Sequence, residues 1–86
     1  MSPKFTKHGE QRAKERGITP QEIDAILYAP DVFSVFSKKD EKAAIAYGNA
    51  GSKLWAVVYD WETGNVITVR PASKKERGIY EQKKRN

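Results

Sequence analysis

The chain has 86 residues, of which 38% are hydrophobic and 31% are charged, and this length predicts one small domain spanning residues 1–86. It contains no cysteine and one histidine, which excludes disulfides and zinc–thiolate sites and argues against any metal site or cofactor. No apolar run approaches the roughly 20 residues of a membrane span, so we expect no membrane association and a cytoplasmic location.

The charge is concentrated at one end of the chain. Residues 1–69 contain nine basic and nine acidic residues, whereas residues 70–86 contain seven basic residues and two acidic ones, which accounts for the net charge of +5. Such a positive segment favours a polyanionic partner such as nucleic acid, or an acidic protein. The alternative is a solvated basic tail that aids solubility.

Two helices are predicted at the beginning of the chain. The first covers residues 7–16, with Thr6 as N-cap and Gly17 as the C-terminal stop. The second opens with a capping box from Thr19 to Glu22 that has Pro20 at its first helical position, and it ends before Pro30.

Four strands follow, over residues 32–36, 42–47, 54–59 and 65–70, and the glycine-containing segment 48–52 is expected to break the second. The short turns between them predict an antiparallel meander. A second capping box, from Ser73 to Glu76, opens a basic C-terminal helix. The fold class is therefore α+β, with two N-terminal helices, a four-stranded antiparallel sheet and a C-terminal basic helix, the helices lying on one face of the sheet.

The end of the last strand is the first candidate site. If Ile67 and Val69 face the helices, alternation places Thr68 and Arg70 on the open face of the sheet. The basic helix begins almost at once, so its free backbone N–H groups would lie near Arg70.

The basic helix adds two cations to this first candidate site. Lys74 and Arg77 lie in its first turns, and together with Arg70 and the helix N-terminus they predict a phosphate site. In the alternative interpretation, Arg70 pairs with a carboxylate across the sheet and Ser73 only caps the helix.

The first helix provides a second candidate site. His8, Arg12 and Arg16 recur at intervals of four and therefore share one helix face. An imidazole titrates near neutral pH, and adjacent arginines would help to hold a phosphate beside it. An ordinary solvent-exposed helix face has the same pattern.

Two segments resemble known toxin families. Residues 69–77 (VRPASKKER), after the strand LWAVVY at 54–59, resemble the C-terminal half of BrnT-type toxins, which belong to the RelE/ParE superfamily. The opening pattern of His8, Arg12, Arg16-Gly17-Ile18 and Glu22-Ile23 is similar to a neighbouring RelE-like family.

The resemblance implies a RelE-like fold and a ribonuclease toxin that cleaves mRNA, free or on the ribosome, and so inhibits translation. It also implies a cognate antitoxin and a toxin–antitoxin hetero-oligomer. Arg70, Ser73 and Arg77 match the polar cluster of the family at the strand–helix junction.

The hypothetical mechanism is metal-independent attack of the RNA 2′-OH on the adjacent phosphorus. A general base or acid, assigned to His8, contributes about 10²–10⁴-fold to such a reaction. The other groups of the hypothetical active site are cationic or hydrogen-bonding. Arg70 and Arg77 stabilise the phosphorane with the assistance of Arg12 or Arg16, and Ser73 belongs to the polar cluster. The expected RNA contacts are Lys74, Lys75 and Thr68.

Two further hypotheses stay open at this point. One is a non-catalytic RelE/ParE relative that inhibits a protein target such as DNA gyrase. The other is a plain nucleic-acid-binding module that uses the basic helix.

Overall fold

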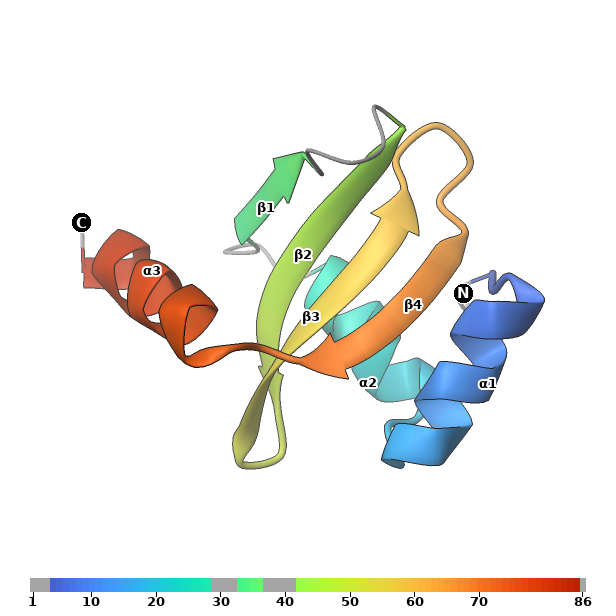
Figure 1. Ribbon diagram of the computed structural model, residues 1–86, viewed down its shortest axis with the longest axis horizontal. Helices are drawn as coiled ribbons and strands as arrows, with labels where there is room; N and C mark the ends of the chain where they lie inside the picture. Colours follow the sequence, from blue (N-terminus) through green and yellow to red (C-terminus); the bar gives the residue numbers. More distant parts are fainter. Residues whose placement is uncertain (1–3, 29–32, 37–41, 86) are drawn as a thin grey trace.

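A computed structural model describes residues 4–28, 33–36 and 42–85 of the chain (Figure 1). Three consecutive antiparallel pairs build a sheet with strand order β1-β2-β3-β4, and three helices pack around it. In chain order the elements are α1 (Lys7–Arg16), α2 (Pro20–Leu27), β1 (Phe33–Phe36), β2 (Ala43–Ala50), β3 (Lys53–Asp60), β4 (Val66–Pro71) and α3 (Lys74–Arg85).

Local sequence signals set the boundaries of the first two helices. The Thr6 side chain accepts a hydrogen bond from the Gly9 N–H at the start of α1, and Gly17 ends that helix in the left-handed conformation, with φ of 73°. Thr19 and Glu22 form the complete capping box predicted for α2. These helix starts and stops are confirmed.

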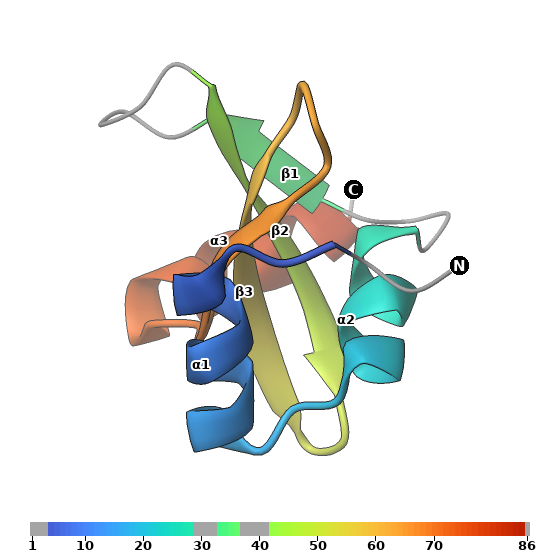
Figure 2. The ribbon, with the colours of Figure 1, turned by 90° about the vertical axis from the view of Figure 1, so that its right-hand side faces the viewer.

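The predicted fold is wrong in the layout of its sheet and helices. The body of the sheet is three-stranded, because β2, β3 and β4 have eight, eight and six residues, whereas β1 contributes only a four-residue edge. The helices do not share one face either. α1 and α2 cover one face, and α3 lies on the other (Figures 1 and 2).

The central strand β3 explains why both faces are covered. Trp55 and Val57 point into a core shared with α1 and α2, while Leu54 and Ala56 point the opposite way, into a smaller core that includes Tyr80 of α3. A strand that is apolar on both faces leaves hydrophobic surface in water unless each face is covered.

Strand β2 continues through the predicted break at residues 48–52, since it ends at Ala50. Gly48 lies inside the strand, where an added Cβ would be 2.9 Å from the Ile26 side chain of α2. The glycine therefore allows α2 to approach the sheet closely, and only Gly51, with φ of 65°, serves the turn.

A β-bulge changes the predicted facing of β4. Tyr59 pairs with Val66 and Val58 with Thr68, so Ile67 is the extra residue. As a result Val66 and Val69, both fully buried, face the α1–α2 core in place of the expected pair Ile67 and Val69. The expectation for Thr68 and Arg70 is unaffected, because both lie beyond the bulge.

Candidate functional site

Three strands bring Tyr47 and Arg70 to the same face of the sheet. Tyr47 pairs with Ala56, and Ala56 pairs with Arg70, so the three residues form a row across β2, β3 and β4. Ala56 is fully buried and belongs to the same small core as Tyr80 of α3. The two outer residues of the row, Tyr47 and Arg70, both bond to Glu76 of α3.

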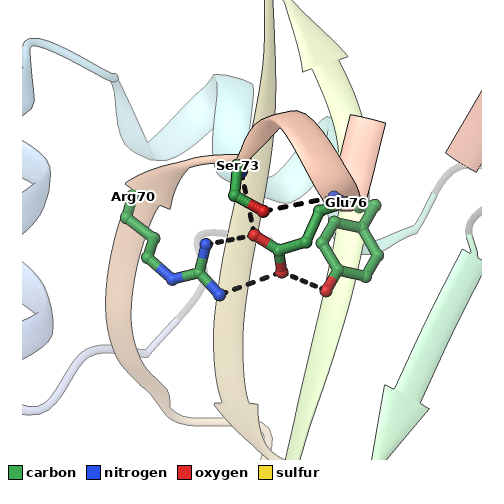
Figure 3. Close-up of polar contacts among 4 residues, drawn as sticks. Arg70, Ser73 and Glu76 are labelled. Carbon is green, nitrogen blue, oxygen red and sulfur yellow. Dashed lines mark hydrogen bonds and ion pairs between the residues drawn. The ribbon is translucent and has the colours of Figure 1, made fainter. Parts of the chain in front are cut away.

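Glu76 joins α3 to the sheet through its carboxylate (Figure 3). Arg70 donates two hydrogen bonds to it, from Nη1 to Oε1 and from Nη2 to Oε2, the second at 2.9 Å. The Tyr47 hydroxyl donates to the same Oε2. We call these three side chains the Tyr47–Arg70–Glu76 clasp.

Glu76 also caps α3. Its Oε1 accepts a hydrogen bond from the Ser73 N–H at 2.9 Å, and its own N–H donates to Ser73 Oγ at 3.1 Å. One carboxylate therefore completes the capping box and holds Arg70. This geometry agrees with the alternative interpretation, in which Arg70 pairs with a carboxylate and Ser73 caps the helix. The carboxylate comes from α3, however, and not from across the sheet.

The clasp fixes the protonation state of its members. The hydrogen bonds from Arg70, with smaller contributions from Tyr47 and the Ser73 N–H, lower the pKa of Glu76 to about 2 against the opposing effect of burial. Burial, followed by the hydrogen bond to Glu76, raises the pKa of Tyr47 to about 12. The bond to Glu76 also raises the pKa of Arg70.

These pKa values matter for chemistry at neutral pH. Glu76 is a weak base and Tyr47 is a weak acid, whereas an efficient general acid or base has a pKa near the working pH. The clasp has the properties of a structural connection: a carboxylate and a guanidinium compensate each other, and a neutral phenol completes their hydrogen bonding.

The predicted residues of α1 lie elsewhere. α1 packs on the opposite face of the sheet from Arg70, so the structure does not bring His8 or Arg12 to the clasp. The Arg12 Nε donates to His8 Nε2 at 3.4 Å, and Arg12 Nη1 pairs with Glu15 at 3.1 Å. Arg16, in the last turn of α1, is likewise exposed and is separated from Arg70 by the sheet.

The remaining predicted cations lie on α3. Lys74, Lys75 and Arg77 are exposed, and none of the three forms an ion pair with another described residue. α3 turns Tyr80, which is 8% exposed, toward the sheet. Thr68, half-buried on β4, shares the sheet face of Arg70.

Sequence reasoning missed Tyr47 and the second contact of Glu76. Glu76 was recognised only as the N3 residue of a capping box, which is a local signal. Its contact with Arg70 depends on the direction that α3 takes after Pro71. Tyr47 reaches it only through the register of three strands, which no short motif encodes.

Comparison with known proteins finds no matching family model, no similar curated protein and no similar solved structure. The resemblance to BrnT-type toxins therefore stays a prediction. Within the described part of the chain, no helix is long and apolar enough to cross a membrane, and no three His, Asp or Glu side chains gather as metal ligands.

Proposed function

We propose that this domain binds RNA through α3. The observation that carries the proposal is the charge state of that helix: Lys74, Lys75 and Arg77 project into solvent with no acidic partner among the described residues. Phosphates that replace the counterions of such lysines and arginines release those ions, which favours binding at low and moderate salt.

The arrangement of acids supports this choice of helix. The nearest carboxylate to these cations along the chain, Glu76, is held by Arg70 and so is directed at the sheet. On α1, in contrast, Arg12 and Lys14 are each paired with an acid of the same helix. The positive potential is therefore centred on α3.

The test is the binding of a fluorescein-labelled 20-nucleotide RNA, followed by anisotropy at several salt concentrations. If the wild type contacts phosphates through all three cations, the slope of log K against log salt is about −2. The double variant Lys74→Ala/Lys75→Ala has a slope shallower by about 1.4 and binds on the order of 25-fold more weakly at 0.1 M salt.

The matched control removes the same charge from α1. The Lys7→Ala/Lys14→Ala variant is expected to bind RNA with an affinity close to that of the wild type. Equal losses in the two double variants, or wild-type binding that does not respond to salt, would exclude α3 as the binding surface. A DNA 20-mer of the same sequence shows whether binding requires the 2′-OH.

The ribonuclease toxin is a second proposal, favoured by one observation. Arg70 and Ser73 both bond to Glu76 at the junction of β4 and α3, where the resemblance implies the polar cluster, and Arg77 follows Ser73 by one turn. His8 lies on the other side of the sheet, so this proposal requires Arg70 to exchange Glu76 for a phosphate and to work without His8.

Cleavage is measured by mapping mRNA 5′ ends in a translating bacterial extract, beside naked RNA. New ends that disappear in Arg70→Ala and are unchanged in His8→Ala would support this revised site, and circular dichroism shows that each variant is folded. Intact mRNA in all lanes would exclude the ribonuclease. The predicted antitoxin and the hetero-oligomer also belong to this proposal.

A further inference from the structure

α3 is attached to the rest of the domain along one side only. Of residues 74–83, all but Glu76 and Tyr80 are exposed, and these two lie four positions apart, on the same side of the helix. The Ala72 N–H donates to the Leu54 carbonyl oxygen at 2.9 Å, which fixes the point from which α3 leaves the sheet. Beyond that point, the direction of the helix depends on Glu76 and Tyr80.

The two attachment residues hold α3 in different ways. Tyr80 packs into the small core, and an apolar contact of this kind is not directional. Glu76, in contrast, accepts hydrogen bonds from the Arg70 guanidinium, the Tyr47 hydroxyl and the Ser73 N–H (Figure 3). Hydrogen bonds constrain both distance and angle, so Glu76 is the residue that sets the direction of α3.

Arg70 is fully engaged in this contact. Both of its terminal nitrogens donate to Glu76, so the pair of N–H groups with which a guanidinium binds a phosphate is occupied. The charge of Arg70 is also matched by the carboxylate. The cations that are left for a polyanion on this side of the molecule are therefore those of α3.

Glu76 lies between Lys75 and Arg77 in the chain, at the centre of the proposed RNA-binding surface. Its side chain is only 16% exposed because Arg70 holds it against the sheet. Without that partner, its charge would act on phosphates bound at the neighbouring cations, since charges within about 10 Å are only partly screened at 0.1 M salt.

We infer that Arg70 is a positioning residue for RNA binding, which holds Glu76 against the sheet and does not contact the RNA itself. In this role Arg70 sets the direction of α3 and keeps an acid away from the phosphates. The inference rests on the proposed RNA binding by α3. It gives Arg70 a different task from the ribonuclease proposal, in which Arg70 releases Glu76 and takes a phosphate.

The first variant in the test is Arg70→Met, because methionine keeps an unbranched apolar stem and removes the charge. The Glu76 carboxylate is then uncompensated beside the cations of α3. In the anisotropy assay we expect the affinity for RNA to fall about fivefold at 0.1 M salt, as for the loss of one phosphate contact. A direct contact between Arg70 and a phosphate predicts the same loss, and a second variant separates the two roles.

That variant is Arg70→Met/Glu76→Gln, which removes both charges of the pair. A glutamine at the N3 position preserves the capping box and can accept the hydrogen bond of the Tyr47 hydroxyl, so α3 stays attached. We expect RNA affinity to return to within about twofold of the wild type, the usual error of a double-mutant cycle. The salt slope should return to about −2. A fivefold loss that persists, with a slope shallower by about 0.7, would show that Arg70 contacts a phosphate and would overturn the inference.

Lys14→Gln is the matched control, because it removes a cation from the exposed pair of Lys14 with Glu10 on α1, where the two charges are 3.4 Å apart. It is expected to bind RNA like the wild type. A loss as large as that of Arg70→Met would mean that binding responds to net charge alone, which also overturns the inference. If the wild type itself does not bind RNA, the proposed function fails as well; binding by the wild type without rescue in the double variant rejects only the role of Arg70.

A second measurement needs no substitution and therefore decides the case even if Arg70→Met does not fold. The Glu76 carboxyl carbon is observed by ¹³C NMR at about pH 3.5, with and without a 20-nucleotide oligouridine. At this pH a carboxyl with a pKa of about 2 is ionised, whereas one at the ordinary 4.5 is mostly protonated. We expect Glu76 to be ionised in both samples. Protonation of Glu76 on addition of RNA would show that Arg70 has left it for a phosphate, and the inference would be wrong.

Discussion

Helices α1 and α3 carry similar cations but present them differently. On α1, Arg12 pairs with Glu15 and Lys14 with Glu10, at 3.1 and 3.4 Å, so two of the four basic residues are compensated on the helix itself. On α3, the first-turn acid Glu76 points to the sheet, and the lysines beside it are uncompensated. The side on which an acid projects, more than the number of acids, decides which helix is a positive surface.

The two helices also differ in how they are attached. α1 lies against β4 at Gly9, which has no side chain, and its contacts are apolar and backbone contacts. α3 is held by the Tyr47–Arg70–Glu76 clasp and by Tyr80, which packs into the small core with Tyr47, Leu54 and Ala56. The first attachment is sensitive to side-chain volume, and the second is sensitive to charge and pH.

The largest effect is expected from Gly9→Ala. A Cβ at this position would overlap the Val66 carbonyl oxygen and lie 3.0 Å from its carbonyl carbon, and backbone atoms of a paired strand cannot move aside. We expect the free energy of unfolding to fall by about 3 kcal/mol or more. Urea denaturation followed by circular dichroism measures it, and a midpoint equal to that of the wild type would contradict the close packing of α1 on β4.

Glu76→Gln is expected to have the next largest effect, because it keeps the shape of the side chain and removes its charge. The folded protein holds the Glu76 pKa at about 2, below the ordinary value of 4.5, so the ionised clasp stabilises the fold. At pH 7 the shift corresponds to a loss of at most ~3 kcal/mol on substitution.

The sign of the pH dependence follows from the same shift. A carboxyl with a lowered pKa contributes its full stability above pH 4.5 and loses it as the pH falls toward 2. The difference in unfolding free energy between the wild type and Glu76→Gln should therefore shrink over this interval. Glu62→Gln, at an exposed ion pair with Lys42, is the control and should show almost no difference at any pH. A constant difference between wild type and Glu76→Gln down to pH 2 would contradict the ionised clasp.

Gly78→Ala on α3 is the counterpart of Gly9→Ala on α1. It is expected to raise the free energy of unfolding, whereas Gly9→Ala lowers it. No atom lies within 4 Å of a Cβ at this position, so the methyl group adds no clash. Alanine is favoured over glycine in a helix by roughly 1 kcal/mol, and the unfolding free energy should rise by about that amount. A lower urea midpoint would show that the position is not part of an exposed, regular helix.

The sequence was sufficient for the elements whose signals are local. Thr6, Thr19 and Ser73 were identified as helix caps from two or three neighbouring residues, and the strand regions came from β-rich segments between turns. The edge strand was predicted over residues 32–36, of which residue 32 lies outside the described part of the chain.

Features that depend on distant residues were missed. The bulge at Ile67 arises from pairing with β3, and the extension of β2 through Gly48 arises from contact with Ile26 of α2. The placement of α3 follows from the second apolar face of β3. The separation of the candidate site residues has the same cause, since a helix face with His8 and a strand end with Arg70 look compatible until the sheet is placed between them.

The smallest effect on stability, and the sharpest test of the comparison, is expected from Glu10→Gln/Glu15→Gln. The ion pairs that these acids form are exposed, so their loss should change the unfolding free energy by less than about 1 kcal/mol. The substitutions leave Arg12 and Lys14 uncompensated on α1. If RNA requires only uncompensated cations, then combining Glu10→Gln/Glu15→Gln with Lys74→Ala/Lys75→Ala should restore part of the lost affinity. The salt dependence of binding should also become steeper. If affinity does not recover, the position of a helix on the fold matters as well as its charge, and the difference between the two helices lies in what each one adjoins.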